Sequence, residues 1–325
     1  MILSFSLIRM LLTDAARYGI LEMLNRQKLT ISVWEKDFMY MKKLFAVVLF
    51  LCLTCSLASA EIVPIELNAK TGFAPKAEGF ISATQYEDES MTVAIEAHQV
   101  GPTTCHVARV KIAHPSQLRS ASAYGFNRPQ TEMTNTIARR VKAVVAINGD
   151  YYSYTGKGYM IRQGKLYMNK PYGDRDVLLI DENGDFHIEP KATAETLAKY
   201  ETMGIVNSFN FGPGLVVDGV ALAEYGHEFN SGDTYAQRSA IAQVKKGEME
   251  YLLITCEGPM ESKGGGMTMT GFAEFIASLG VETAYNLDGG NSASMYFNGK
   301  KVNAIGNKDE RRISDIIYFA SAQSE

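Results

Sequence analysis

Three short segments of this 325-residue chain place carboxylates, an arginine and small polar side chains directly beside apolar runs. In the segment richest in such groups, an apolar run ends at Asp288 and is followed by Gly289, Gly290, Asn291 and Ser292. The glycines permit close backbone approach, and their exposed N–H groups can grip an anion beside the carboxylate. An isolated Asp-Gly-Gly is an ordinary turn, so the interpretation depends on the other two segments.

The second segment is Asn148-Gly149-Asp150-Tyr151-Tyr152, another apolar run that ends at a carboxylate. Its tyrosines could stack on the face of a sugar ring, or could simply pack on the surface. The third segment begins an apolar run with Gln237-Arg238-Ser239, where the ordinary interpretation of the arginine is a solvated or ion-paired side chain.

Together these segments resemble the phosphodiester glycosidase family. The resemblance covers residues 142–320 and keeps the family's order of short motifs, ending with Glu310-Arg311-Arg312-Ile313 in place of E-R-x-V. Four positions depart from the family pattern, namely Glu257 for an aspartate, Ala242 and Asn291 for glycines, and Arg312 for a common proline. The departures leave open the substrate and the role of Glu257.

The resemblance implies hydrolysis of a sugar-1-phosphodiester between the anomeric carbon and the phosphate oxygen. Such chemistry requires carboxylates to stabilise an oxocarbenium-like transition state and cations to hold the departing phosphate. We therefore predict the following site. The catalytic carboxylates are Asp288 first, then Asp150 and Glu257; Arg238 and Arg311 hold phosphate; Asn148, Gly289, Gly290, Asn291 and Ser292 contact substrate; and Tyr151 and Tyr152 line the sugar subsite.

No dedicated metal or nucleotide motif is present. The five histidines are scattered, Gly264-Gly265-Gly266 lacks the Lys-Ser/Thr of a phosphate-binding loop, and no G-x-S-x-G elbow occurs. We expect no required cofactor, although a divalent cation could join several acids and a phosphate in one pocket. Two alternatives stay open: a non-catalytic binder of glycan phosphates, and a metal-dependent phosphodiesterase that attacks phosphorus.

The elements that must position these residues indicate an α+β fold, with a mixed, largely antiparallel sheet and a few flanking helices. After a polar lead over residues 61–90, residues 91–325 form one phosphodiester glycosidase domain. Strands are expected over 91–100, 106–113, 142–147, 239–244, 250–255, 284–287, 293–297 and 313–320; hairpins over 160–167, 177–188 and 215–220; and helices over 131–141, 193–203 and 270–279. The Asn183-Gly184 pair predicts a two-residue type I′ turn.

The N-terminal sequence indicates a segment that is removed by processing. Residues 41–60 combine two lysines, an apolar stretch and an Ala-Ser-Ala cleavage site, as in a secretory signal peptide. Residues 1–40 are then a mis-annotated upstream extension, with Met41 as the true start, or else a real extension before the signal peptide. The expected product is periplasmic or secreted, acts in the cell envelope and has no stable membrane insertion.

Cys105 and Cys256 remain in the processed chain, either as a disulfide or as two buried thiols. A net charge of −4 gives no reason to expect nucleic-acid binding.

Overall fold

The computed structural model describes residues 22–23, 62–126, 128–223, 225, 234–258, 264–304 and 309–324. The chain divides into two compact units, Met1–Ser59 and Ala60–Glu325. All elements below belong to the second unit. The expected signal peptide and upstream extension lie outside the described residues, apart from 22–23, and stay predictions.

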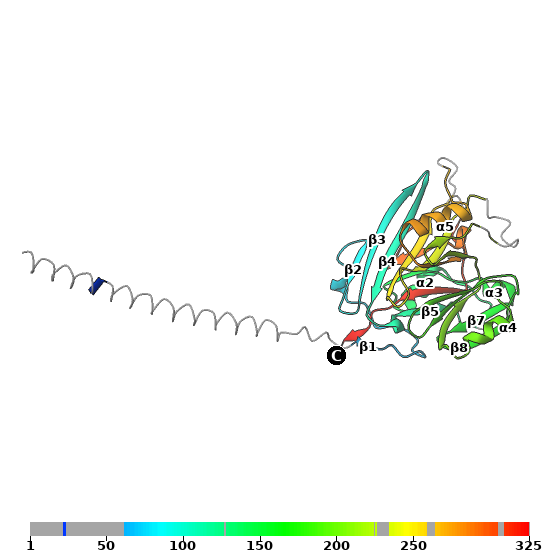
Figure 1. Cartoon of the computed structure of the whole chain (residues 1–325), viewed down its shortest axis with the longest axis horizontal. Coiled ribbons are helices and arrows are strands. Elements are labelled where there is room, and N and C mark those ends of the chain that lie inside the picture. Colours follow the sequence, from blue (N-terminus) through cyan, green and yellow to red (C-terminus); the bar gives the residue numbers. More distant parts are fainter. Residues whose placement is uncertain are drawn as a thin grey trace, which may run out of the picture. The chain divides into compact units, whose positions relative to one another are not determined.

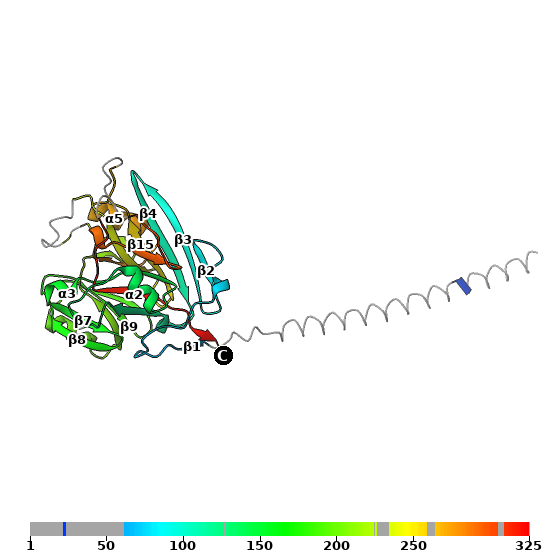
Figure 2. The ribbon, with the colours of Figure 1, turned by 180° about the vertical axis from the view of Figure 1, so that it is seen from behind.

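An eight-stranded antiparallel sheet forms the largest layer of this unit. Its long β3–β4 hairpin stands out in cyan in Figure 1, and Figure 2 shows it from behind. The hairpin pairs all ten residues of each strand, as the alternation of apolar and polar residues predicts. In spatial order the strands are β13 (Val220–Ala221), β12 (Gly214–Val217), β16 (Thr283–Leu287), β14 (Arg238–Gln243), β15 (Glu250–Cys256), β4 (Thr103–Ile112), β3 (Met91–Val100) and β2 (Gln85–Glu87).

Two five-stranded sheets complete the β framework. Every strand pairing described in them is antiparallel. One has the order β10 (Phe186–Glu189), β9 (Val177–Asp181), β11 (Ile205–Phe209), β7 (Gly158–Arg162) and β8 (Lys165–Lys170). The other has the order β18 (Lys300–Lys301), β17 (Met295–Phe297), β6 (Val145–Asn148), β19 (Asp315–Phe319) and β5 (Leu118–Ser122), while β1 (Ile62–Val63) pairs with β20 (Gln323–Ser324).

The central core lies between the three sheets, and helices cover their outer faces. One buried cluster contains side chains from all three sheets, among them Ile241, Leu287, Ile147 and Phe209. Helix α5 (Met269–Ser278) packs on the other face of the eight-stranded sheet, and α2 (Thr134–Arg140) packs against β6 and β19. The remaining short helices are α3 (Tyr152–Thr155), α4 (Ala194–Leu197) and the 3-10 turns η1 (Ala77–Gly79), η2 (Pro115–Gln117), η3 (Ala198–Tyr200) and η4 (Gly290–Ser292).

The fold class is confirmed, and three local details differ from expectation. The predicted lead joins the domain, because β2 pairs with β3 and Ile65 and Tyr86 are buried. The expected helix over 193–203 is α4 followed by η3. The Asn183-Gly184 turn is longer than two residues, because the Asp181 carboxylate accepts the N–H groups of Asn183 and Asp185 and only Gly184 has a positive φ there. In the described part of the chain, no helix is long and apolar enough to cross a membrane.

Candidate functional site

Asn148 joins the ends of strands from two different sheets. Its side-chain Nδ2 donates to the Asp288 carbonyl at 2.7 Å, and its Oδ1 accepts from Ser239 Oγ at 2.8 Å and from Ser294 N at 3.1 Å. The predicted strand ends therefore do converge. Since both ends of this fully buried amide are occupied by protein groups, Asn148 holds Asp288 in place and is not presented to a ligand.

Asp288 occupies the end of β16 in a nearly dry environment, with 6% of the residue exposed. Arg311 Nη1 lies 3.9 Å from its Oδ2. Burial raises the pKa of Asp288 to about 6 and outweighs the lowering by Ser292, Arg311 and the Gly289 N–H, while the nearby Asp150 charge adds to the rise. Asp288 can therefore carry a proton at mildly acidic pH.

The loop after Asp288 is pinned at both ends. Gly290, with φ of 57°, donates its N–H to the Gln237 carbonyl at 2.9 Å, and Arg311 N donates to the Asn291 carbonyl at 2.9 Å. Ser292 is fully buried, and its hydroxyl lies close enough to Asp288 to favour the charged carboxylate. Within the described residues this hydroxyl has no partner at hydrogen-bonding geometry. Burying a hydroxyl without a hydrogen bond costs free energy. The Ser292 hydroxyl is therefore suited to form a hydrogen bond with a ligand.

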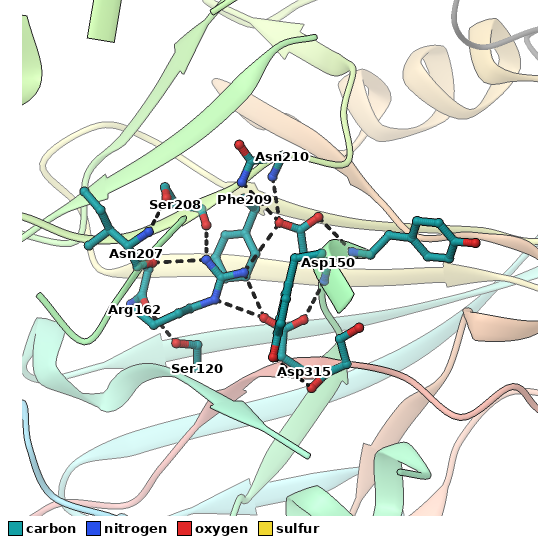
Figure 3. Close-up of polar contacts among 12 residues, drawn as sticks. Ser120, Asp150, Arg162, Asn207, Ser208, Phe209, Asn210 and Asp315 are labelled. Atoms are coloured by element: carbon teal, nitrogen blue, oxygen red, sulfur yellow. Dashed lines mark hydrogen bonds and ion pairs between the residues drawn. The ribbon is translucent and has the colours of Figure 1, made fainter. Parts of the chain in front are cut away.

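Asp150 is buried as well, with 4% of the residue exposed, but N–H donors surround its carboxylate (Figure 3). Oδ1 accepts the Tyr151 N–H at 2.9 Å, and Oδ2 accepts the Asn210 N–H at 2.8 Å. Asn210 Nδ2 and Arg162 Nη2 each lie 3.4 Å from Oδ2. Donors of this kind favour the charged form of a carboxylate. Asp150 and Asp288 are also close, since Asp288 N donates to the Gly149 carbonyl at 3.4 Å.

Three residues around Asp150 are absent from the sequence prediction. Arg162 lies in β7, Asn210 follows β11, and Asp315 begins β19. For Arg162 and Asp315 the sequence did hold a signal, because each is an ionisable residue at the boundary of an apolar run. The runs are Gly-Tyr-Met-Ile-Arg162 and Asp315-Ile-Ile-Tyr-Phe. All residues of both strands are buried, and buried charges need partners.

The two predicted tyrosines lie in different environments. Tyr152 is 6% exposed and its hydroxyl donates to the Ser314 carbonyl at 3.4 Å, so it is a core residue. Tyr151 stacks on Tyr154 with ring centroids 4.5 Å apart and meets Phe211 edge-on at 6.4 Å. Tyr154 is 52% exposed. We call Tyr151, Tyr154 and Phe211 the aromatic platform; the Tyr151 backbone connects it directly to Asp150.

Glu257 and Arg238 have their described contacts elsewhere. Glu257 Oε1 accepts the Ala304 N–H at 2.9 Å and lies 3.0 Å from His106 Nε2. The Arg238 guanidinium donates to the carbonyls of Met267 and Thr234, each at 2.9 Å. Burial lowers the pKa of Arg238. Arg311 is the predicted arginine that the structure brings into contact with Asp288.

No group of three or more His, Cys, Asp or Glu side chains within the described ranges is arranged to hold a metal ion. Cys105 and Cys256 form a disulfide between the neighbouring strands β4 and β15.

A family model for phosphodiester glycosidases matches residues 141–320, and the chain belongs to this family. The fold is similar to that of a zebrafish N-acetylglucosamine-1-phosphodiester alpha-N-acetylglucosaminidase (NAGPA) catalytic domain auto-inhibited by its pro-peptide. That match has a TM-score of 0.57 and 19% identity, and it covers 77% of this chain and 87% of the zebrafish one.

Two further proteins match a smaller share of this chain. The SPbeta prophage-derived uncharacterized protein YomE of Bacillus subtilis strain 168 is 27% identical over 202 residues, which is 60% of this chain and 30% of YomE. The chain thus spans less than a third of that protein's length. A hypothetical protein from Synechocystis matches with a TM-score of 0.47 and 18% identity, over 71% of this chain and 62% of that one.

Proposed function

We propose that this chain hydrolyses a sugar-1-phosphodiester at the anomeric carbon. The observation that carries the proposal is the meeting of Asp288, Asp150 and Arg311 at the ends of strands from separate sheets. Two carboxylates in contrasting environments beside a cation suit an oxocarbenium-like transition state with a departing phosphate.

The environments suggest distinct roles for the two carboxylates. Asp150, surrounded by N–H donors, acts as the ionised group that stabilises positive charge at the anomeric carbon or activates water. Asp288, whose pKa is about 6, holds or delivers a proton on the leaving-group side. Arg311, 44% exposed at its side chain, can turn toward the phosphate, and Ser292 Oγ supplies a further donor.

The aromatic platform is the proposed sugar subsite. An exposed aromatic ring offers an apolar face to the C–H groups of a pyranose, and Tyr154 has this exposure. Its attachment through Tyr151 to Asp150 places such a sugar beside the ionised carboxylate.

Kinetics on a soluble model substrate, UDP-N-acetylglucosamine, test the assignment. We expect Asp288→Asn to lower kcat by about 100- to 10,000-fold, which is the usual contribution of a general acid or base. Glu257→Gln is the matched acidic control, since its described contacts are with His106 and Ala304. Wild-type rates from a folded Asp288→Asn protein would remove Asp288 from the chemistry.

We also propose that no metal cofactor is required. Activity should survive dialysis against excess chelator, whereas a metal-dependent phosphodiesterase would lose it and regain it with added divalent cation. A non-catalytic binder of glycan phosphates would retain ligand but show no turnover before or after chelation.

Export to the cell envelope is part of the proposal. The Cys105–Cys256 disulfide supports it, because disulfides persist mainly in oxidising compartments. Mass spectrometry of the product of the full-length gene should show a protein that begins at Glu61. A product that retains residues 41–60 would contradict cleavage.

A further inference from the structure

Arg162 and Asp315 form a fully buried ion pair directly behind Asp150. Figure 3 shows the guanidinium on one side of the Asp315 and Asp150 carboxylates, in contact with both. We propose that this pair is a positioning device that holds the Asp150 carboxylate in one orientation beside the Arg162 cation. The inference rests on the proposed function for its catalytic meaning, because it deepens the role of Asp150.

All three nitrogens of the Arg162 guanidinium form hydrogen bonds, which fix its position. Nε and Nη2 donate to Asp315 Oδ2 at 3.0 and 2.8 Å, and Nη2 also reaches Asp150 Oδ2 at 3.4 Å. Nη1 donates to the carbonyls of Ile161 and Ser208. The guanidinium carbon also lies 4.3 Å from the Phe209 ring centroid. A planar group with five donors suits this arrangement, whereas a lysine ammonium has three donors and no plane.

Asp315 fixes the backbone that carries Asp150. Its Oδ1 accepts the Asp150 N–H at 2.8 Å, and its carbonyl accepts the Gly149 N–H at 2.8 Å. A Cβ on Gly149 would lie 2.6 Å from the same Oδ1, so the glycine is required for this close approach. One residue of β19 thereby holds both the guanidinium and the main chain of the 149–150 turn.

The charges around Asp150 make the device testable. Arg162 attracts negative charge on Asp150, whereas Asp315 and Asp288 repel it, and Arg311 lies beyond Asp288. The phenols of Tyr152 and Tyr285 also face Asp150 and are neutral at physiological pH. Loss of the Arg162 cation should therefore make Asp150 harder to ionise, whereas loss of the Asp315 carboxyl, whose pKa burial raises to about 6, should not.

The test measures ionisation and activity in the same variants. Protein labelled with ¹³C at the aspartate Cγ is titrated by NMR, with Asp150 assigned by its missing signal in Asp150→Asn. Arg162→Met should move the Asp150 midpoint and the acid limb of the kcat/KM profile upward by about one to three pH units, whereas Asp315→Asn should move neither upward. Arg162→Lys should recover part of the shift but leave kcat reduced, because its geometry differs.

Arg119→Met is the matched control, since Arg119 is also buried but binds the carbonyls of Glu66 and Ala69 and the Tyr318 hydroxyl. It should leave the Asp150 midpoint unchanged. If Arg162→Met does not fold, the reduced kcat of Arg162→Lys, which keeps the charge but loses the planar set of donors, still decides the question.

An unchanged Asp150 midpoint in Arg162→Met, an upward shift in Asp315→Asn, or a wild-type kcat in Arg162→Lys would overturn the inference. If wild-type protein cleaves no sugar-1-phosphodiester while Arg162→Met still raises the Asp150 midpoint, the proposed function fails and the positioning device stands.

Discussion

Asp150 and Asp288 show how two carboxylates with similar sequence contexts can acquire different chemistry. Each follows an apolar strand and is buried, but N–H donors surround Asp150, whereas Asp288 has Arg311 at 3.9 Å. Environments of this kind separate the protonation behaviour of paired acids in hydrolytic sites. The contrast supplies the acid and the ionised group that the proposed reaction needs.

The raised pKa of Asp288 predicts a stability cost at neutral pH. Its folded value of about 6 exceeds the ordinary 3.8, so between these values the folded protein keeps a proton that the unfolded chain releases. Stability therefore falls as pH rises from about 4 to 6 and stays lowered above that. Asp288→Asn should be more stable than wild type by up to about 3 kcal/mol at pH 7.5, with no such gain near pH 3.5.

Urea unfolding of both proteins at the two pH values measures this difference. Equal stability at pH 7.5 would show that Asp288 is not held in an unfavourable environment.

At this scale the sequence predicted site residues that lie in the recognised motifs and missed those at the ends of other strands. Asp288, Asp150 and Arg311 follow from the motifs, and the structure brings them together. Arg162 and Asp315 lie 153 positions apart, and their contact depends on how β7 and β19 meet. Glu257 also ends a strand, but its side chain meets His106 and Ala304 at another part of the sheet edge.

Among the elements, the four-residue helix α3 decides which tyrosines belong to the proposed sugar subsite. Tyr151 and Tyr154 are three positions apart, so one helical turn brings their rings together, while Tyr152 points into the core. The sequence prediction treated 151 and 152 alike, because adjacent tyrosines carry no sign of a helical turn. Most strands and hairpins were predicted well, since their alternation and turn residues are local signals.

Removal of the exposed ring should weaken substrate binding without slowing the chemistry. Tyr154→Ala is expected to raise KM about 3- to 10-fold at nearly constant kcat, because stacking on an aromatic face contributes roughly 0.5–1.5 kcal/mol. Tyr154→Phe retains the ring and should behave as wild type in steady-state kinetics. An unchanged KM for Tyr154→Ala would place the sugar elsewhere.

The close approach of the β6 end to β19 predicts sensitivity at Gly149. Gly149→Ala would put a methyl group 2.6 Å from Asp315 Oδ1. We expect a loss of about 1–3 kcal/mol in unfolding free energy from overpacking, and a fall in kcat of ~100-fold from displacement of Asp150. Urea unfolding and kinetics on one preparation check both; a variant with wild-type stability and kcat would mean that the turn has room to move.

For the molecule as a whole, the site lies where three sheets meet. β6 and β19 come from one five-stranded sheet, β7 and β11 from the other, and β14 and β16 from the eight-stranded sheet. Local sequence patterns identify the strands but carry little information about which sheet each one joins. The α+β class was therefore predictable, whereas the three-sheet junction behind Asp150 was not.

The disulfide should contribute to the stability of this assembly. Cys105 and Cys256 are separated by 151 positions, and closing so long a loop restricts the unfolded chain. The Cys105→Ala/Cys256→Ala variant should lose about 2–4 kcal/mol of unfolding free energy, and reduced wild type should lose a similar amount in urea unfolding. No difference between oxidised and reduced wild type would contradict a formed bridge.

Hydrolysis of UDP-N-acetylglucosamine in ¹⁸O-labelled water tests the proposed bond cleavage most directly. Water that attacks the anomeric carbon leaves its oxygen on the sugar, so mass spectrometry should find the label in N-acetylglucosamine and none in the released phosphate group. Label in the phosphate group would contradict glycosidic cleavage and show attack at phosphorus instead.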